Sequence, residues 1–203
     1  GYVGSQPSVI RRGLSVLPTI GAATTFIDIG CGKGRGLAVA TEFPFGDIYG
    51  VELLAKLAQV AEANMALLSA RHPARTRARV LQGDATQPPM PQAGDLVIYM
   101  YNPFSGPVVD RLLDSVEAHL ERTPQLRAFV VYCNAVHGER LDARPRFSRY
   151  FAEQTAFSAE ETPASPFGNT SDSLVIWQAG RDPASPHPGA DRDIFVKIPN
   201  LAA

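Results

Sequence analysis

Short apolar runs alternate along the chain with longer segments in which apolar residues recur every three or four positions. The runs predict strands and the periodic segments predict helices. The expected strands are residues 25–29, 48–52, 78–82, 95–101 and 127–133, and the expected helices are residues 7–17, 37–42, 54–69 and 108–121. This alternation requires crossover connections, so it predicts a doubly wound, mostly parallel α/β sheet with helices on both faces.

The pattern changes after residue 134. Residues 150–157 and 173–179 predict two strands joined by a loop that contains Pro, Gly and Ser, and we expect them to form an antiparallel hairpin at one edge of the sheet. Residues 193–198 are apolar enough that we expect them to dock as an edge strand or to contact a partner. The expected organisation is an N-terminal helical segment over residues 1–24, one domain over residues 25–180 and a tail over residues 181–203.

Composition narrows the range of functions. The 203 residues, 45% of them hydrophobic, suffice for one substantial core. Nineteen basic and twenty acidic residues give a net charge of -1, so we expect neither a nucleic-acid partner nor a membrane partner. The two cysteines, Cys31 and Cys133, indicate a reducing compartment and therefore the cytoplasm. The four histidines show no metal-ligand spacing, so no metal is expected, and the oligomeric state stays open.

A glycine-rich turn, residues 28–36, follows the first expected strand, at the place where doubly wound sheets bind their ligands. A dinucleotide fingerprint would need a further glycine at position 35 or 37, where this chain has Arg35 and Leu37. Asp28 would repel a pyrophosphate but suits a ligand that carries an ammonium and a sulfonium. The turn therefore favours S-adenosylmethionine. A nicotinamide-dependent oxidoreductase stays as the alternative, because Glu52 could bind the ribose of either cofactor.

Residues 26–35 resemble motif I of the class I S-adenosylmethionine-dependent methyltransferases, and residues 50–52 and 83–85 resemble the ends of that family's second and third strands. The resemblance implies a seven-stranded sheet, S-adenosylmethionine as cofactor and methyl transfer as the reaction. It implies that Glu52 accepts both ribose hydroxyls, since a carboxylate can bind two neighbouring donors. Asp84 would receive the adenine amine. The implied cofactor-binding residues are Asp28, Gly30, Cys31, Gly32, Gly34, Glu52, Leu53, Asp84, Ala85 and Asn102.

Asn102, Pro103 and Phe104 follow the fourth expected strand and resemble the motif that faces the transferable methyl in enzymes that methylate nitrogen. The resemblance makes these three the catalytic residues and favours an amine acceptor on a protein side chain or a small molecule. This chain has one Pro where the family motif has two, so the acceptor atom stays open, and Asn-Pro is also a frequent turn opener. Asn134 and His137 follow the fifth strand, and their part in catalysis is open. A non-catalytic module that binds S-adenosylmethionine is a further hypothesis.

Overall fold

The computed structural model describes residues 5–101, 104–162, 169–194 and 196. In chain order the elements are α1 (Pro7–Ser15), β1 (Thr24–Ile29), α2 (Arg35–Ala40), β2 (Asp47–Glu52), α3 (Ala55–Arg71), β3 (Ala78–Gln82), β4 (Asp95–Tyr101), α4 (Gly106–Arg122), β5 (Arg127–Cys133), α5 (Glu139–Asp142), β6 (Ser148–Ala156) and β7 (Ser171–Gly180). None of the described helices has the length and apolar composition needed to span a membrane.

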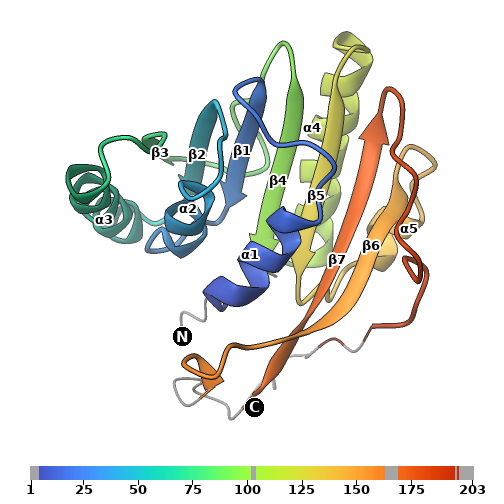
Figure 1. Ribbon diagram of the computed structural model, residues 1–203. Helices are drawn as coiled ribbons and strands as arrows, with labels where there is room; N and C mark the ends of the chain where they lie inside the picture. The colour runs from blue at the N-terminus through green and yellow to red at the C-terminus, as the bar shows by residue number, and fades with distance from the viewer. Residues whose placement is uncertain (1–4, 102–103, 163–168, 195, 197–203) are drawn as a thin grey trace.

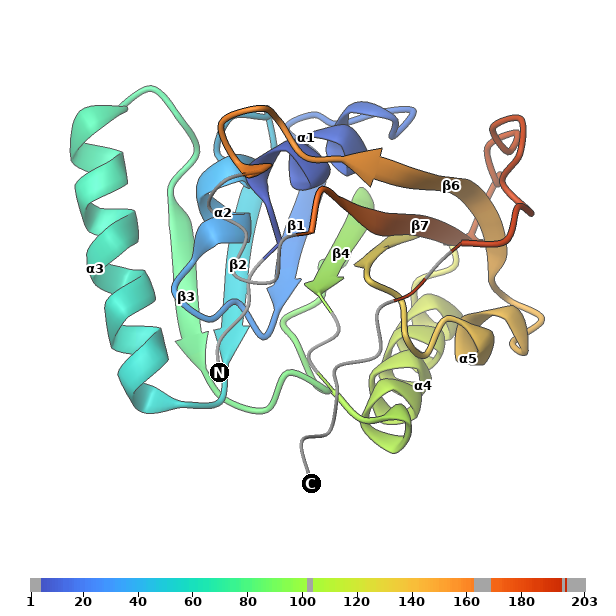
Figure 2. The same ribbon diagram turned by 90° about the horizontal axis from the view of Figure 1, so that it is seen from below.

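The strands form one seven-stranded sheet in the order β3-β2-β1-β4-β5-β7-β6 (Figure 1). The first five strands in that order are parallel, whereas β7 is antiparallel to both β5 and β6. The helices α1, α2 and α3 lie on one face and α4 and α5 on the other (Figure 2). The predicted doubly wound sheet with an antiparallel edge hairpin is therefore confirmed.

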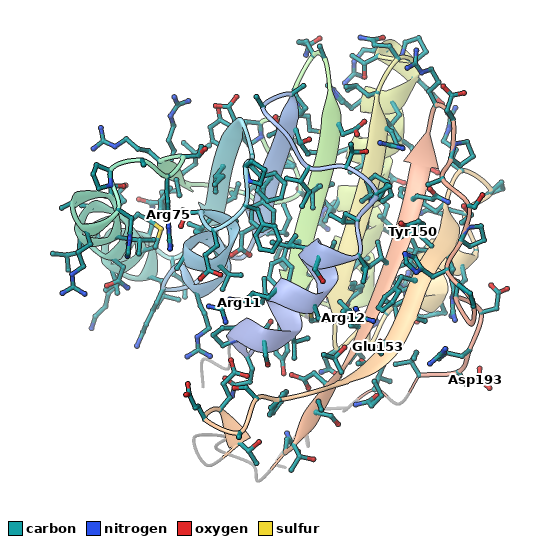
Figure 3. All side chains as sticks on the ribbon, viewed as in Figure 1. Arg11, Arg12, Arg75, Tyr150, Glu153 and Asp193 are labelled. Atoms are coloured by element: carbon teal, nitrogen blue, oxygen red, sulfur yellow. The ribbon has the colours of Figure 1, made fainter. Side chains whose placement is uncertain are left out.

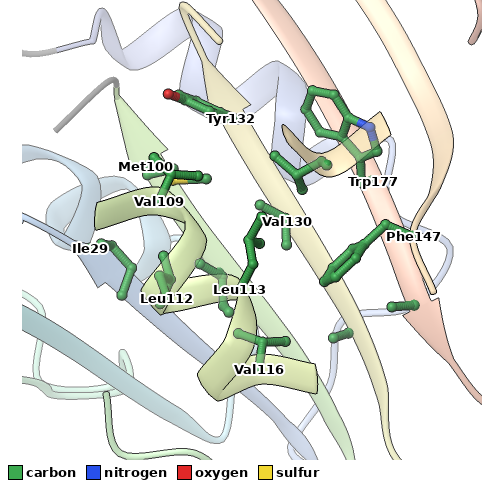
Figure 4. Close-up of a cluster of buried hydrophobic side chains, with 14 of the residues drawn as sticks. Ile29, Met100, Val109, Leu112, Leu113, Val116, Val130, Tyr132, Phe147 and Trp177 are labelled. Atoms are coloured by element: carbon green, nitrogen blue, oxygen red, sulfur yellow. The ribbon is translucent and has the colours of Figure 1, made fainter. Parts of the chain in front are cut away.

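Each face of the sheet carries its own apolar cluster. The stripe on α4 packs against β1, β4 and β5 (Figure 4), with Leu112 and Val116 fully buried. On the other face, α1 buries Ile10 and Leu14 in a cluster that includes side chains of β1, β4, β5 and β7. The central strands β1, β4 and β5 are buried on both faces because crossover helices cover them, which explains why their sequences are continuous apolar runs, whereas the edge strand β3 is largely exposed.

Three differences from the expected elements have local causes. α2 begins at Arg35 because Gly34 precedes it in a left-handed conformation, with φ 86°, and ends the turn there. α5 was not expected, since four residues carry no periodic pattern. In the tail, residues 193, 194 and 196 belong to no strand, and Ile194 instead packs against the cluster beneath α4. Residues 195, 197 and 198 of the expected edge strand lie outside the described residues.

Candidate cofactor site

The turn between β1 and α2 adopts left-handed conformations at three glycines. The backbone angle φ is 73° at Gly30, 55° at Gly32 and 86° at Gly34, which residues with a Cβ rarely adopt. The N–H groups of Gly30 and Cys31 both donate to the carbonyl oxygen of Val51, at 2.9 and 3.1 Å. The turn is therefore tied to the end of β2, and its shape requires the glycines.

Gly50 on β2 leaves the space that Cys31 fills. A Cβ at Gly50 would lie 2.6 Å from Leu37 Cδ1 and 2.8 Å from Cys31 Sγ, which is too close for either atom. Burial is the largest cause that raises the pKa of the Cys31 thiol, so the thiol stays neutral. Cys31 is thus a packed residue of the turn and not a nucleophile.

Glu52 ends β2 with its carboxylate directed at the glycine turn. Its Oε2 accepts a hydrogen bond from the backbone N–H of Gly32 at 2.9 Å, and its Oε1 accepts one from the N–H of Leu54 at 2.9 Å. The residue is only 7% exposed. Each carboxylate oxygen offers about two lone-pair sites, so both oxygens can accept a further donor. The arrangement holds a negative charge and two acceptors beside the turn.

Asp28 lies one residue before the end of β1, where it pairs with Gly50 on β2 and Tyr99 on β4. Its carboxyl group packs beneath Gly36, where a Cβ would overlap the carboxyl oxygen. Burial, and secondly the charge of Glu52, raise the pKa of Asp28 to about 8. Without a bound cation, this raised pKa favours the protonated carboxyl group of Asp28 at neutral pH.

Asp84 lies just beyond β3, beside the end of β2. The N–H of Gly83 donates to the carbonyl oxygen of Glu52 at 3.0 Å, which joins the two chain segments at this edge. The backbone N–H of Thr86 donates to the carboxylate of Asp84 at 2.9 Å and is the largest cause that lowers the pKa of Asp84. The residue is exposed and its lowered pKa favours the charged form, so its carboxylate is charged and accessible.

Two apolar residues complete this side of the site. Leu53 follows Glu52 and is 68% exposed, whereas Ala85 follows Asp84 and is buried. Leu53 therefore offers an exposed apolar surface next to Glu52. The structure thus brings Gly30, Cys31, Gly32, Gly34, Glu52, Leu53, Asp84 and Ala85 to the carboxyl edge of β1, β2 and β3, with Asp28 beneath them.

The predicted acceptor residues are only partly described. Asn102 and Pro103 lie outside the described residues, so their roles stay predictions. Phe104 is half-buried and packs against the cluster beneath α4. Its position after β4 places it at the same sheet edge as the glycine turn.

Asp172 at the start of β7 is a buried carboxylate that sequence reasoning missed. The hydroxyl of Tyr101, at the end of β4, is hydrogen-bonded to it, and burial followed by the charge of Asp172 raises the pKa of Tyr101. Asn134, with φ 48°, donates its backbone N–H to Ser173 at 2.8 Å. Because β7 runs antiparallel to β5, its first residues meet the carboxyl ends of β4 and β5. The only feature of the sequence that pointed to Asp172 was the position of an acidic residue at the start of an apolar strand.

The segment before α1 reaches the same edge. Ser5 is buried, its hydroxyl is hydrogen-bonded to that of Tyr99 on β4, and its carbonyl oxygen accepts from the guanidinium of Arg35 at 3.2 Å. Tyr99 also hydrogen-bonds Cys133, and burial raises the pKa of that thiol to about 12. Ser5 therefore holds the leading segment against β4 and the start of α2, and Cys133 is a neutral core thiol.

His137, the remaining titratable candidate, follows β5 at the same carboxyl edge of the sheet. His137 Nδ1 lies 3.8 Å from Glu139 Oε1 at the surface beyond Asn134. Among the described residues, no three His, Cys, Asp or Glu side chains are grouped as ligands of one metal ion.

Neither a family model nor a curated protein sequence matches this chain. Solved structures, in contrast, match this chain over most of its length. An RNA methyltransferase from Salinibacter ruber in complex with S-adenosyl-L-homocysteine is 18% identical with a TM-score of 0.56, and the match covers 90% of this chain and 97% of that one. A dimethyladenosine transferase from Plasmodium falciparum is 11% identical with a TM-score of 0.58, over 88% of this chain and 63% of that one.

A third similar structure is named as a decarboxylase and not as a methyltransferase. Precorrin 8w decarboxylase from Methanobacterium thermoautotrophicum is 17% identical with a TM-score of 0.57, and the match covers 88% of this chain and 92% of that one. At identities this low, the matches establish a common fold and nothing beyond it. Together with the strand order, they show that the chain has the fold of the class I S-adenosylmethionine-dependent methyltransferases.

Proposed function

We propose that this protein is a methyltransferase that uses S-adenosylmethionine. The observation that carries the proposal is the carboxylate of Glu52, held against the N–H of Gly32 with acceptor capacity to spare, at the edge of the sheet where this fold binds ligands. A buried acid at the end of β2, beside a left-handed glycine turn, suits a cationic nucleoside with a ribose diol.

The residues at the edge fit the parts of this cofactor. Glu52 would accept the two ribose hydroxyls, and Asp84 would accept the adenine amine. Leu53, which is 68% exposed, would cover the flank of the adenine. Glycines at positions 30, 32 and 34 let the backbone approach the aminoacyl part without a Cβ in the way.

The protein's contribution to the reaction is alignment and electrostatic fit. S-adenosylmethionine, when bound, supplies an electrophilic methyl group, so the chain needs no nucleophile of its own. The neutral thiols of Cys31 and Cys133 agree with this. Asn102 would orient an acceptor amine through its carbonyl oxygen, while Phe104 would cover the acceptor's flank. No covalent enzyme intermediate is expected.

Asn102, Pro103 and Phe104 favour a nitrogen atom as the acceptor of the methyl group. Two of the solved structures with this fold are named for RNA or adenosine methylation, and a base amine is a nitrogen acceptor as well. The net charge of -1 spoke against nucleic acid, but a net charge says nothing about where the basic residues gather.

Calorimetric titration tests cofactor binding first. Glu52→Ala should weaken the binding of S-adenosylmethionine and of S-adenosyl-L-homocysteine by about 10-fold or more, as expected for the loss of a charged hydrogen-bond acceptor. Glu62→Ala, which removes an exposed acid from α3, is the matched control and should change affinity less than about twofold. Equal affinity in all three proteins would remove Glu52 from the site.

Methyl transfer is tested separately. The cofactor-loaded protein is incubated with fractionated cell extract, and labelled methyl is followed into each fraction. Transfer into one fraction, with a mass gain of one methyl, supports the enzyme. Tight cofactor binding without transfer into any fraction favours a non-catalytic binding module. Binding of reduced nicotinamide cofactors in place of S-adenosylmethionine would instead support the oxidoreductase.

A further inference from the structure

Basic residues gather at the β3 edge of the sheet, although the whole chain is nearly neutral. Residues 63–83 contain no acid, and they include Arg71, Arg75, Arg77 and Arg79 together with His72. The other residues of the chain hold fifteen basic and twenty acidic side chains. These residues lie at the end of α3, in the loop after it and in β3. Asp47 and Glu62 lie near them, so basic side chains outnumber acidic ones at this edge.

These arginines differ from most others in the structure in their lack of acidic partners. Arg11, Arg12, Arg127, Arg144 and Arg149 each have a carboxylate oxygen within 2.8 Å. Among the described residues, Arg71, Arg75 and Arg77 form no ion pair, although the charge of Arg75 contributes, after Arg11, to the lowered pKa of Glu42. Arg79 donates to the hydroxyl of Tyr49 at 3.0 Å and has one ion pair at 3.8 Å, with Asp47. Arg75 lies beside α3, at the opposite edge of the sheet from the Arg12–Glu153 pair of α1 and β6 (Figure 3). Most of the guanidinium groups at the β3 edge therefore have no acidic side chain in contact with them.

The surface at this edge is concave. Two hollows of about 480 and 350 Å³ lie between α3 and β3 and share Ala66, Ser69 and Arg77. Arg79 lines the larger hollow and Arg75 the smaller, so the shared wall makes one groove with three guanidinium groups along it. Glu62 is the one acid in its lining. We call this surface, defined by Ser69, Arg75, Arg77 and Arg79, the arginine groove.

We propose that the arginine groove binds the sugar-phosphate backbone of an RNA strand that carries the methyl acceptor; this step rests on the proposed methyltransferase function. A guanidinium binds a phosphate through two parallel N–H donors, and a polyanion with a charge on every unit can engage several guanidinium groups at once. The groove supplies three of them with few competing acids.

The position of the groove connects it to the candidate cofactor site. Arg77, Arg79 and Asp84 follow one another along β3 and the turn after it, and Asp84 stands at the cofactor edge. At about 3.3 Å per residue, Arg77 and Asp84 are roughly 20 Å apart. A strand bound along the groove therefore extends over a few nucleotides to the edge where a base would meet the methyl group. Phosphate contacts of this kind fix the register without reading the sequence.

Fluorescence anisotropy tests the groove with a labelled single-stranded RNA of 20 nucleotides and mixed sequence. Arg75→Ala/Arg77→Ala should raise the Kd at least 10-fold. The log–log slope of affinity against salt should become shallower by about 1.4, because each lost phosphate contact on a single strand accounts for about 0.7. Arg146→Ala/Arg181→Ala removes two exposed arginines elsewhere on the molecule and should leave the Kd within twofold. Arg75→Gln/Arg77→Gln repeats the test with side chains that keep an aliphatic stem and a polar end but carry no charge.

The proposal would be overturned if the native chain bound no RNA at 50 mM salt, or if the groove and control variants lost RNA affinity equally. It would also be overturned if the salt slope of the groove variant were unchanged, or if polyglutamate displaced the labelled RNA more readily than unlabelled RNA does. Tighter binding of DNA of the same sequence would overturn the RNA assignment.

S-adenosyl-L-homocysteine binding, measured on the same variants, should be unchanged. If the native chain binds RNA but no cofactor, the proposed function fails and the groove stands; if it binds cofactor but no RNA, the reverse holds.

Discussion

The charge of Glu52 acts on the buried carboxyl group of Asp28 across the neighbouring strands β2 and β1. Burial is the larger cause and Glu52 the second, and together they raise the pKa of Asp28 to about 8. One acid at the cofactor edge thus keeps its proton near neutral pH while the other provides the charge. The state of Asp28 should therefore be visible in how stability depends on pH.

Asp28→Asn should remove part of that pH dependence. The native carboxyl group keeps its proton between pH 4 and 8, where the unfolded one has lost it, so the native state binds more protons in this window. The contribution of Asp28 to stability is full below about pH 4 and is lost as pH rises to about 8. The free energy of unfolding of the native chain should fall relative to Asp28→Asn by up to about 1.4 kcal/mol per pH unit there.

Urea unfolding at pH 5.5, 6.5, 7.5 and 8.5 measures the difference between the two proteins. A constant offset is expected from packing of the amide and carries no information on titration. Parallel curves for the two proteins would show that the pKa of Asp28 is not raised in the native state.

Asn102→Ala should lower methyl transfer more than cofactor affinity. If the amide orients an acceptor amine, its loss misplaces the reacting atoms, which costs roughly 100-fold in rate. The Kd for S-adenosyl-L-homocysteine should change less than about threefold. The measurement uses the extract fraction that accepts labelled methyl. An unaltered rate would end the catalytic role of Asn102.

Arg144 should matter more to stability than its neighbour Arg146. Arg144 has a side chain that is 16% exposed, and its Nη1 lies 2.6 Å from Glu117 and 2.8 Å from Asp114 on α4. Arg146 pairs with Glu121 at 2.7 Å, but those side chains are 47% and 60% exposed. Arg144→Ala should cost about 2 kcal/mol of unfolding free energy and Arg146→Ala less than about 1 kcal/mol, by urea unfolding. Equal losses would show that the α4 ion pairs are solvent-screened.

The strands were predictable because their cause is local. β3, β4 and β5 have the expected bounds. β4 and β5 are apolar runs that each end before an asparagine, whereas β3 has only a short apolar pair, Val80 and Leu81. The glycine turn and the acids Glu52 and Asp84 were predictable for a related reason: parallel strands bring their carboxyl ends to one edge.

The remainder depends on tertiary packing that no local pattern encodes. The pKa of Asp28 is raised because α2 packs over the carboxyl group at Gly36 and, secondly, because Glu52 lies nearby. Asp172 reaches Tyr101 only because β7 inserts antiparallel next to β5. The arginines of the groove were visible in the sequence, but a net charge averaged over the chain concealed their excess over the acids at that edge.

Gly50→Ala tests how tightly the turn is packed. A methyl group at Gly50 would displace Leu37 and Cys31, whose side-chain atoms lie within 2.9 Å of its position. Such overpacking costs about 1–3 kcal/mol, and because Cys31 belongs to the turn, its displacement should also weaken the binding of S-adenosyl-L-homocysteine. Gly21→Ala is the matched control, since a Cβ there meets no atom within 4 Å. Urea unfolding and calorimetry on both variants should show losses for Gly50→Ala alone; a stable Gly50→Ala with native affinity would mean that the turn yields easily and that its shape does not determine the site.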